Sequence, residues 1–217
     1  MNNADARVAM DQMYRHQRYF YDLTRKYYLF GRDRLIAELP VGKKDHICEV
    51  GCGTARNLVL LGKKHLQARL YGVDASAEML KTASASVHAA GLGSRIQLAT
   101  ALATTFSPKL FGLTARFDRL IYSYSLSMMD DWREALEHGL KQMKPGGTLH
   151  VVDFGDQEGL PRWFKAMLGR WLDQFHVRFR PEVRAWFEDE ERNGRGRMSH
   201  RSVMRGYAYR LDFSTKA

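Results

Sequence analysis

The sequence contains little cysteine and no long apolar run. Its two cysteines, Cys48 and Cys52, supply neither a disulfide framework nor a four-ligand zinc site, which favours a reducing cytosol. No stretch reaches the ~18 apolar residues of a membrane span, and the N-terminal stretch MNNADARVAMDQ lacks the apolar core of a secretion signal. The eight histidines show neither HxH nor HxxxH spacing. The sequence therefore predicts a cytoplasmic protein without a metal site.

Acidic residues are the next deficit. The chain has 217 residues, enough for one domain with a real core, and 34 Lys and Arg stand against 24 Asp and Glu. The net charge is +10 and the pI is near 9.7. So basic a chain favours an anionic partner, which leaves nucleic acid, an acidic membrane, or a phosphate- or carboxylate-bearing substrate open.

Apolar stretches in the middle of the chain alternate with helical patterns. Strands are predicted at 47–50, 70–73, 96–99, 117–122 and 148–154. Helices are predicted at about 5–37, from the first glycine turn to about 66, from Ser76 to Gly91, and at 132–143, where LysProGlyGly ends the last one. Such alternation indicates βαβ units and a mostly parallel α/β sheet. Ligands of these sheets bind beyond the carboxyl ends of the strands.

A glycine-rich turn follows the first predicted strand and reads Glu49-Val-Gly51-Cys-Gly53-Thr-Ala55. The dinucleotide fingerprint needs a third glycine at 56, where the chain has Arg56, so a pyrophosphate site is disfavoured. Glu49 places negative charge beside the ligand, which suits a cation. Asp74 ends the second strand, where a carboxylate accepts both ribose hydroxyls. The pattern favours a positively charged nucleoside without phosphates.

Four stretches together, EVGCGTA, GVDAS, FDRLIYSYSLSM and LKQMKPGGTLHVVDF, resemble the class I S-adenosylmethionine-dependent methyltransferases. The resemblance implies S-adenosylmethionine as cofactor and a Rossmann-like fold. It also implies a mostly parallel seven-stranded sheet with helices on both faces and an added N-terminal helical segment. The whole chain, 1–217, is expected to be one domain: a lid at 1–40, a cofactor-binding core at 45–155, and C-terminal helices and terminal strands at 156–217.

The same resemblance implies a set of cofactor-binding residues. Two departures from the family pattern stand out, because Ala55 replaces a frequent third glycine and Leu102 replaces a frequent acidic residue. Adenine recognition is then expected to rest on the backbone near Ala103. The implied cofactor-binding residues are Tyr21, Arg25, Arg32, Gly51, Cys52, Gly53, Asp74, Ala75, Met79, Leu102, Ala103 and Ser123.

A second resemblance covers about residues 10 to 180. The stretches YRHQRYFYDLTRKYYLFGRDRLI, SYSLSMMDDW and VVDFGDQEGLPRWFKAMLGRWLDQFHV are similar to the bacterial diacylglycerylhomoserine N-methyltransferases, which trimethylate a lipid headgroup amine. This implies a cytoplasmic enzyme, peripherally associated with the anionic inner membrane, that binds no nucleic acid. A phosphatidylethanolamine or small-molecule amine N-methyltransferase and an RNA-binding methyltransferase remain as alternatives. Arg15, Arg18 and Arg25 are equal candidates to face a substrate carboxylate.

Aromatic residues suit methyl transfer to an amine, because their faces stabilise the growing positive charge by roughly 0.5–2 kcal/mol per ring. Helical periodicity places Tyr14, Tyr21 and Tyr28 on one face, with simple packing as the other interpretation. Tyr21 and Tyr124 are the expected catalytic residues, with Tyr122 a further candidate ring. A general base is not evident, because Ser127 stands where many relatives carry histidine. Asp130 and Asp131 are more readily explained as the cap of the next helix.

Two C-terminal segments bear on membrane contact. A helix from Pro161 carries an apolar stripe, with Arg162, Lys165 and Arg170 on the other side. Packing on the sheet and insertion into an anionic lipid surface both explain this pattern. The arginine-rich segment at 192–201 adds attraction to anionic lipid or is a solvated loop. The stripe consists of Trp163, Phe164, Met167, Leu168, Trp171, Leu172 and Phe175.

Overall fold

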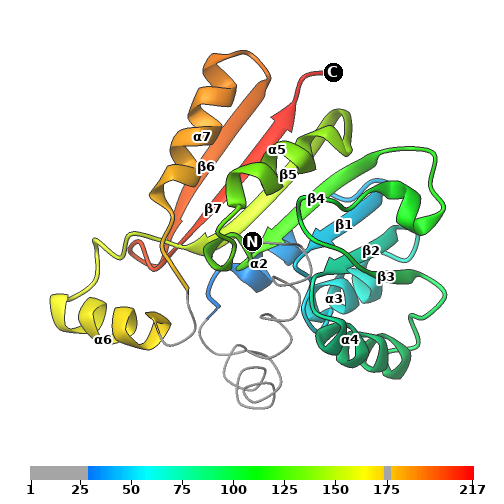
Figure 1. Ribbon diagram of the computed structural model, residues 1–217, viewed down its shortest axis with the longest axis horizontal. Helices are drawn as coiled ribbons and strands as arrows, with labels where there is room; N and C mark the ends of the chain where they lie inside the picture. The colour runs from blue at the N-terminus through cyan, green and yellow to red at the C-terminus, as the bar shows by residue number, and fades with distance from the viewer. Residues whose placement is uncertain (1–28, 174–176) are drawn as a thin grey trace.

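The computed structural model describes residues 29–173 and 177–217, which form one seven-stranded sheet with helices packed against it (Figure 1). The strands are β1 (His46–Val50), β2 (Arg69–Asp74), β3 (Ile96–Thr100), β4 (Phe117–Ser123), β5 (Met143–Phe154), β6 (Gly196–Val203) and β7 (Ala208–Thr215). The helices are α2 (Arg32–Glu38), α3 (Arg56–Lys64), α4 (Ala77–Ala89), α5 (Trp132–Lys141), α6 (Arg162–Asp173) and α7 (Pro181–Arg192), with short 3₁₀ turns η1 (Pro108–Phe111) and η2 (Leu126–Met128).

The strand order is β3-β2-β1-β4-β5-β7-β6, and only β7 runs against its neighbours. The other pairings are parallel, with Val50 of β1 opposite Val73 of β2 and Tyr122 of β4. The carboxyl ends of β1, β2 and β4 therefore meet at one edge of the sheet. This confirms the predicted mostly parallel α/β sheet and places its ligand-binding edge.

Successive strand residues point to opposite faces, and each face carries its own apolar core. Ile47 of β1 packs with α2, α3 and α4, whereas the next residue, Cys48, packs with α5 and α7. Leu70 and Tyr71 of β2 divide in the same way. Both cores consist of buried side chains, so the prediction of helices on both faces is confirmed.

The predicted helix at 5–37 is wrong as one continuous element. Helix α2 begins only at Arg32, because Gly31 before it has a φ of 82°, in the left-handed region that interrupts an α-helix. A Cβ at Gly31 would lie 3.2 Å from a side-chain carbon of Val203, so the chain also packs closely against β6 there. The rest of the predicted helix, at 5–28, lies outside the described residues.

The segment LysProGlyGly at 144–147 is also different from the prediction. Helix α5 ends at Lys141, and β5 already begins at Met143, opposite Phe117. The pairing register then shifts between Phe117 and Arg119, while Gly146 donates its backbone N–H to Lys216. Hydrogen bonds and pairing on both sides thus hold this segment in the sheet despite its turn-forming residues.

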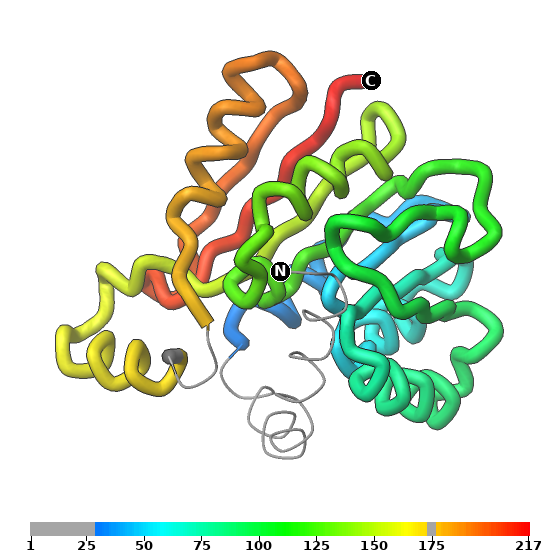
Figure 2. Tube along the Cα trace, in the orientation of Figure 1, coloured from blue at the N-terminus to red at the C-terminus, as the bar shows by residue number. Residues whose placement is uncertain are grey.

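Helix α6 does not cover the sheet. It extends beyond the ends of β5 and β7 (Figure 2). Leu168 and Leu172 are buried, but Trp163 is 69% exposed and Met167 is 55% exposed. The predicted apolar stripe is therefore divided between a packed side and an open side, and Phe175 lies outside the described residues. No helix among the described residues is long and apolar enough to cross a membrane.

Candidate functional site

The turn between β1 and α3 has the backbone conformation that its glycines allow. Gly51 and Gly53 have φ values of 74° and 52°, and a Cβ at Gly51 would lie 2.7 Å from the Cβ of Ser125. Ala55 occupies the frequent third-glycine position and also takes a left-handed φ of 60°, with its methyl group fully buried. The turn therefore keeps its shape despite the substitution, at the ordinary cost of a left-handed alanine, about 1–2 kcal/mol.

Asp74 ends β2 and faces this turn. One carboxylate oxygen accepts the backbone N–H of Gly53 at 2.8 Å, and the other accepts that of Ser76 at 2.9 Å. The side chain is largely buried, with 8% of the residue exposed. A carboxylate oxygen can accept more than one hydrogen bond, so a carboxylate in this position suits the hydroxyl groups of a ligand.

A cavity of about 60 Å³ lies at this edge of the sheet. The predicted residue Leu102 is not among its lining residues, and the neighbouring Ala101 takes that place, with its N–H bonded to the carbonyl of Asp74. We call this space the Asp74 cavity. It is lined by Gly51, Gly53, Asp74, Ala75, Met79, Ala101, Ala103, Tyr124, Ser125, Met128 and Met129.

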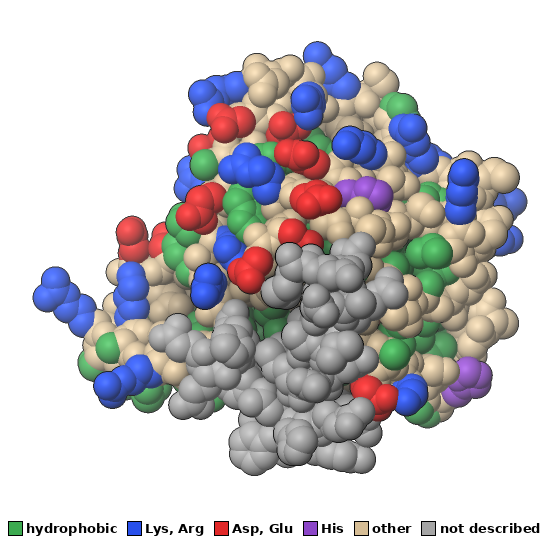
Figure 3. Space-filling model, viewed as in Figure 1, with side chains coloured by type: hydrophobic (Ala, Val, Ile, Leu, Met, Phe, Trp, Pro, Cys, Tyr) green, Lys and Arg blue, Asp and Glu red, His purple; other side chains and the backbone are tan. Residues whose placement is uncertain are grey.

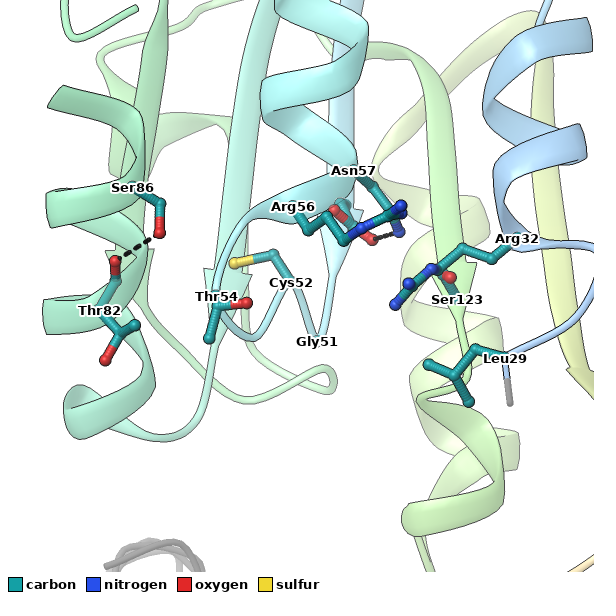
Figure 4. A pocket seen from close by; sticks show the side chains of 11 residues that line it. Leu29, Arg32, Gly51, Cys52, Thr54, Arg56, Asn57, Thr82, Ser86 and Ser123 are labelled. Atoms are coloured by element: carbon teal, nitrogen blue, oxygen red, sulfur yellow. Dashed lines mark hydrogen bonds between the residues drawn. The ribbon is translucent and has the colours of Figure 1, made fainter. Parts of the chain in front are cut away.

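A second cavity, of about 220 Å³, lies on the other side of the glycine turn (Figure 4). We call it the Glu49 cavity. Glu49 is 2% exposed and accepts a 2.6 Å hydrogen bond from the Asn57 side chain. Arg32, from the start of α2, reaches toward Ser123 across the cavity from Asn57. A buried carboxylate and a largely buried guanidinium thus line one space, and an ammonium and a carboxylate of a ligand match them.

Two further contacts shape the Glu49 cavity. Arg56 forms a two-pronged ion pair with Asp33, with N–O distances of 2.5 and 3.0 Å, which ties α3 to α2. This hydrogen bonding holds the pKa of Asp33 below its usual range. Cys52 also lines the cavity, and burial raises the pKa of its thiol well above the ordinary value, so the sulfur is a neutral lining atom.

The two predicted tyrosines of β4 have different positions. Tyr122 is buried in the α5–α7 core, where its hydroxyl donates to the carbonyl of Ala135 at 3.0 Å, so it is not at the edge. Tyr124 follows β4, lines the Asp74 cavity and has a φ of 54°. Its hydroxyl donates to the carbonyl of Phe30 at 2.5 Å. Tyr124 therefore borders the cavity, while its ring packs edge-on against Phe154, with ring centroids 4.8 Å apart, and its hydroxyl holds the segment before α2.

Asp153, near the end of β5, was not among the predicted site residues. It is 2% exposed, and its oxygens accept the backbone N–H groups of Ser127 at 3.0 Å and Phe154 at 2.8 Å. Burial raises its pKa to about 6. The sequence signal was present, because a carboxylate in an otherwise apolar strand needs a partner, but Ser127 lies 26 positions away.

The remaining predicted residues divide into two groups. Tyr14, Tyr21, Tyr28 and Arg25, with Arg15 and Arg18, lie outside the described residues, so their roles stay predictions. Asp131 stands at the N-cap of α5 without a side-chain hydrogen bond, and the exposed Asp130 pairs with Arg180 at 3.0 Å. Within 29–173 and 177–217, no group of three metal-ligating side chains occurs.

Residues 47–147, just under half of the chain, match the family model described as a methyltransferase domain. The solved structure of apo SibL, an S-adenosylmethionine-dependent methyltransferase, aligns with a TM-score of 0.70 at 19% identity, over 91% of this chain and 58% of that one. YcgJ from Bacillus subtilis aligns with a TM-score of 0.65 at 15% identity, over 86% and 98%. The chain has a class I methyltransferase fold and carries a methyltransferase domain.

Named relatives of this methyltransferase domain match it over part of their length. Trans-aconitate 2-methyltransferase from Azoarcus sp. (strain BH72) is 26% identical over 54% of this chain and 42% of its own length. The Escherichia coli O157:H7 protein of that name is 26% identical over 74% and 53%. O-methyltransferase resE from Aspergillus sclerotiorum is 29% identical over 54% and 42%. The chain thus spans about half the length of these relatives.

The lining of the two cavities fits S-adenosylmethionine. Asp74 places a carboxylate in one cavity, the group that accepts ribose hydroxyls in sheets of this kind, and the apolar Met79, Ala101 and Ala103 suit a flat base. Glu49 and Arg32 match an ammonium and a carboxylate on the other side of the turn. The buried carboxylates beside the turn favour a cation over a phosphate. Leu102 is the one predicted cofactor residue in the described part of the chain that lines neither cavity.

Proposed function

We propose that the chain transfers the methyl group of S-adenosylmethionine to an acceptor bound at the carboxyl edge of the sheet. The observation that carries this proposal is the position of Asp74, which faces the Gly51–Gly53 turn with both oxygens already oriented by backbone N–H groups. Glu49 lies buried beside the same turn. A nucleoside bearing a positive charge and no phosphate satisfies both carboxylates.

The described residues bind and align rather than take part in covalent chemistry. When bound, the sulfonium of the cofactor would supply an electrophilic methyl group, which the lone pair of the acceptor would attack in line as the C–S bond breaks and S-adenosylhomocysteine leaves, so alignment would account for most of the acceleration. Met128, Met129 and Tyr124 line the Asp74 cavity. Asp153 fixes the backbone of this loop through Ser127. An amine with a free lone pair needs only a route for its proton to water.

The acceptor that we propose is the amine of a lipid headgroup. Support comes from exposed apolar side chains at the same edge as the cofactor cavities, together with cationic side chains (Figure 3). Trp163 and Met167 are open on α6 between Arg162 and Arg170, and Met204 is 57% exposed in the turn between β6 and β7. Aromatic and apolar residues beside Lys and Arg are typical of surfaces that lie on anionic lipid. A headgroup raised from a membrane meets the site at this edge.

A small soluble acid is the second candidate acceptor. Trans-aconitate 2-methyltransferases are similar to this chain over the methyltransferase domain, which favours methyl transfer to a carboxylate oxygen. RNA remains a third class, for which the net charge is the supporting observation.

Labelled S-adenosylmethionine distinguishes the three classes in one assay. The protein is incubated with vesicles carrying an amine headgroup, with trans-aconitate, and with total RNA, and the label is followed into each acceptor. We expect label in the lipid fraction that increases with each added methyl group. Label that enters only trans-aconitate or only RNA contradicts the lipid proposal, and absence of transfer to all three, despite cofactor binding, contradicts all three acceptor classes.

A further inference from the structure

A row of polar and charged side chains crosses β5 and β7 on the face of the sheet that carries α2. His150 of β5 lies opposite Asp212 of β7, and their Nδ1 and Oδ1 atoms are 2.6 Å apart. Arg210, two positions before Asp212 and so on the same face, donates to both carboxylate oxygens of Asp212, at 3.0 and 3.3 Å. Its Nη1 atom donates to Glu38, in the last turn of α2, at 2.7 Å. We call these four residues the Arg210 network.

Arg210 is the buried partner of Glu38. Its side chain is 10% exposed, and a guanidinium in such a place requires the carboxylates that flank it. Glu38 also pairs with Arg34 and Arg201, at 2.6 and 3.8 Å, but these arginine side chains are 72% and 60% exposed. Ion pairs at the surface contribute little, because water screens them. The contact with Arg210 therefore fixes the last turn of α2 to β7.

His150 holds the other end of the network inside the sheet. The residue is 2% exposed, and burial lowers the pKa of its imidazole below the ordinary value. A neutral imidazole with its proton on Nδ1 donates to Asp212, and the Nε2 atom, which has no hydrogen-bond partner among the described residues, then carries no proton. Asp212 is thus held from β5 while it holds Arg210.

Helix α2 connects this network to the Glu49 cavity. It has seven residues, so Arg32 in its first turn and Glu38 in its last are about 9 Å apart along the axis. A helix of this length is not stable alone, and its position depends on what holds it. Leu35 and Ile36 pack in the core, but apolar contacts are less directional than hydrogen bonds. Arg32 reaches from α2 toward Ser123 in the cavity (Figure 4), so a shift of α2 moves its guanidinium there.

We infer that Arg210 is a positioning residue, which holds α2 through Glu38 so that Arg32 meets the carboxylate of the cofactor. The inference rests on the cofactor binding in the proposed function and adds a residue that sets affinity for the amino-acid part of S-adenosylmethionine. Arg210 lines neither cofactor cavity, so it acts on binding through α2. A buried ion pair stabilises less than apolar contacts of similar volume, but it fixes the register of the elements that it joins.

The test is calorimetric titration of the full chain with S-adenosylmethionine and with its decarboxylated form, which keeps the ammonium and the sulfonium but lacks the carboxylate. Wild type is expected to bind S-adenosylmethionine more tightly than the decarboxylated form. Arg210→Gln is expected to weaken binding of S-adenosylmethionine by roughly three- to thirtyfold and to leave binding of the decarboxylated form unchanged. A merely structural role weakens binding of both. Arg34→Gln, which removes an exposed partner of Glu38, is the matched control and is expected to bind both ligands like wild type.

A second variant keeps the inference testable if Arg210→Gln does not fold. Glu38→Ala removes the same contact from its more exposed side and leaves Arg210 paired with Asp212. We expect it to weaken binding of S-adenosylmethionine in the wild-type background but not in an Arg32→Gln background, because Glu38 acts through Arg32.

The outcomes separate the two claims. A wild-type chain that binds neither ligand overturns the proposed function. A chain that binds them overturns the positioning inference in any of three cases: equal wild-type affinity for both ligands, the same loss for both ligands in the folded variants, or the same effect of Glu38→Ala with and without Arg32.

Discussion

Asp153 shows how a single buried carboxylate holds the loop that contributes Tyr124, Ser125, Met128 and Met129 to the Asp74 cavity. Its two oxygens accept N–H groups from Ser127 and from Phe154, which connects the end of β5 to the loop after β4. Burial opposes its charge more strongly than these hydrogen bonds favour it, so its pKa rises to about 6. Asp153 therefore stabilises the loop through its hydrogen bonds, although its buried position disfavours the charged form of its carboxyl group.

This raised pKa predicts a pH-dependent stability. The folded state binds the Asp153 proton more tightly than the unfolded state, in which the pKa is near 3.8. Its contribution is therefore fully present below pH ~4 and is lost as the pH rises through about 6, by roughly 3 kcal/mol in total. Asp153→Asn cannot ionise. We expect its unfolding free energy, relative to wild type, to increase by that order between pH 4 and pH 7 in urea titrations.

A stability difference between the two proteins that stays constant with pH contradicts this assignment. The constant part of the difference carries no information on ionisation, because the asparagine amide replaces one acceptor oxygen with a donor. Only the change of this stability difference with pH tests whether the pKa of Asp153 is raised.

Helix α6 combines an apolar side that is packed with an apolar side that is exposed. Its buried side, Leu168 and Leu172, holds it to the end of the sheet, while Trp163 and Met167 remain exposed. On this open side Trp163 contacts the Phe164 ring of the same helix edge-on, with ring centroids 5.8 Å apart. The cations Arg162 and Arg170 on the same helix attract an anionic surface, within the ~8–10 Å over which exposed charges act at moderate ionic strength.

The double variant Trp163→Ser, Met167→Ser tests α6 as a lipid-binding element. We expect it to bind anionic phosphatidylglycerol vesicles several-fold more weakly than wild type at low salt, because apolar area no longer enters the interface. Leu66→Ser is the control, since Leu66 is 75% exposed on the loop between α3 and β2. Vesicle flotation gives the measurement. Equal binding by wild type and the double variant contradicts a role for α6.

At the scale of the whole molecule, features encoded over short distances were predictable. The strand and helix alternation follows from local periodicity, and the turn at Gly51 and Gly53 follows from two adjacent glycines. Asp74 was predictable because the end of β2 must lie beside the end of β1 in a parallel sheet. Gly31 shows the limit even locally, because nothing in the helical pattern before it reveals that β6 approaches the chain there.

Features that depend on distant pairing were not predictable. Asp153 lies beside Tyr209 only because β5 and β7 pair antiparallel, with 56 positions between the two residues. The open side of α6 was equally hidden, because its stripe of apolar residues has the same periodicity as a helix packed on a sheet.

The central claim, that the carboxyl edge binds S-adenosylmethionine through Asp74, is tested most directly by calorimetric titration. We predict that wild type binds S-adenosylmethionine and that Asp74→Ala weakens binding by roughly 1–3 kcal/mol for each ribose hydrogen bond lost. Glu137→Ala, which removes an exposed carboxylate from α5, should bind like wild type. NAD should bind far more weakly. The negative charge of Glu49 disfavours a pyrophosphate, and Arg56 stands where the dinucleotide fingerprint has its third glycine. Unchanged affinity in Asp74→Ala, or tighter binding of NAD than of S-adenosylmethionine, would contradict the account.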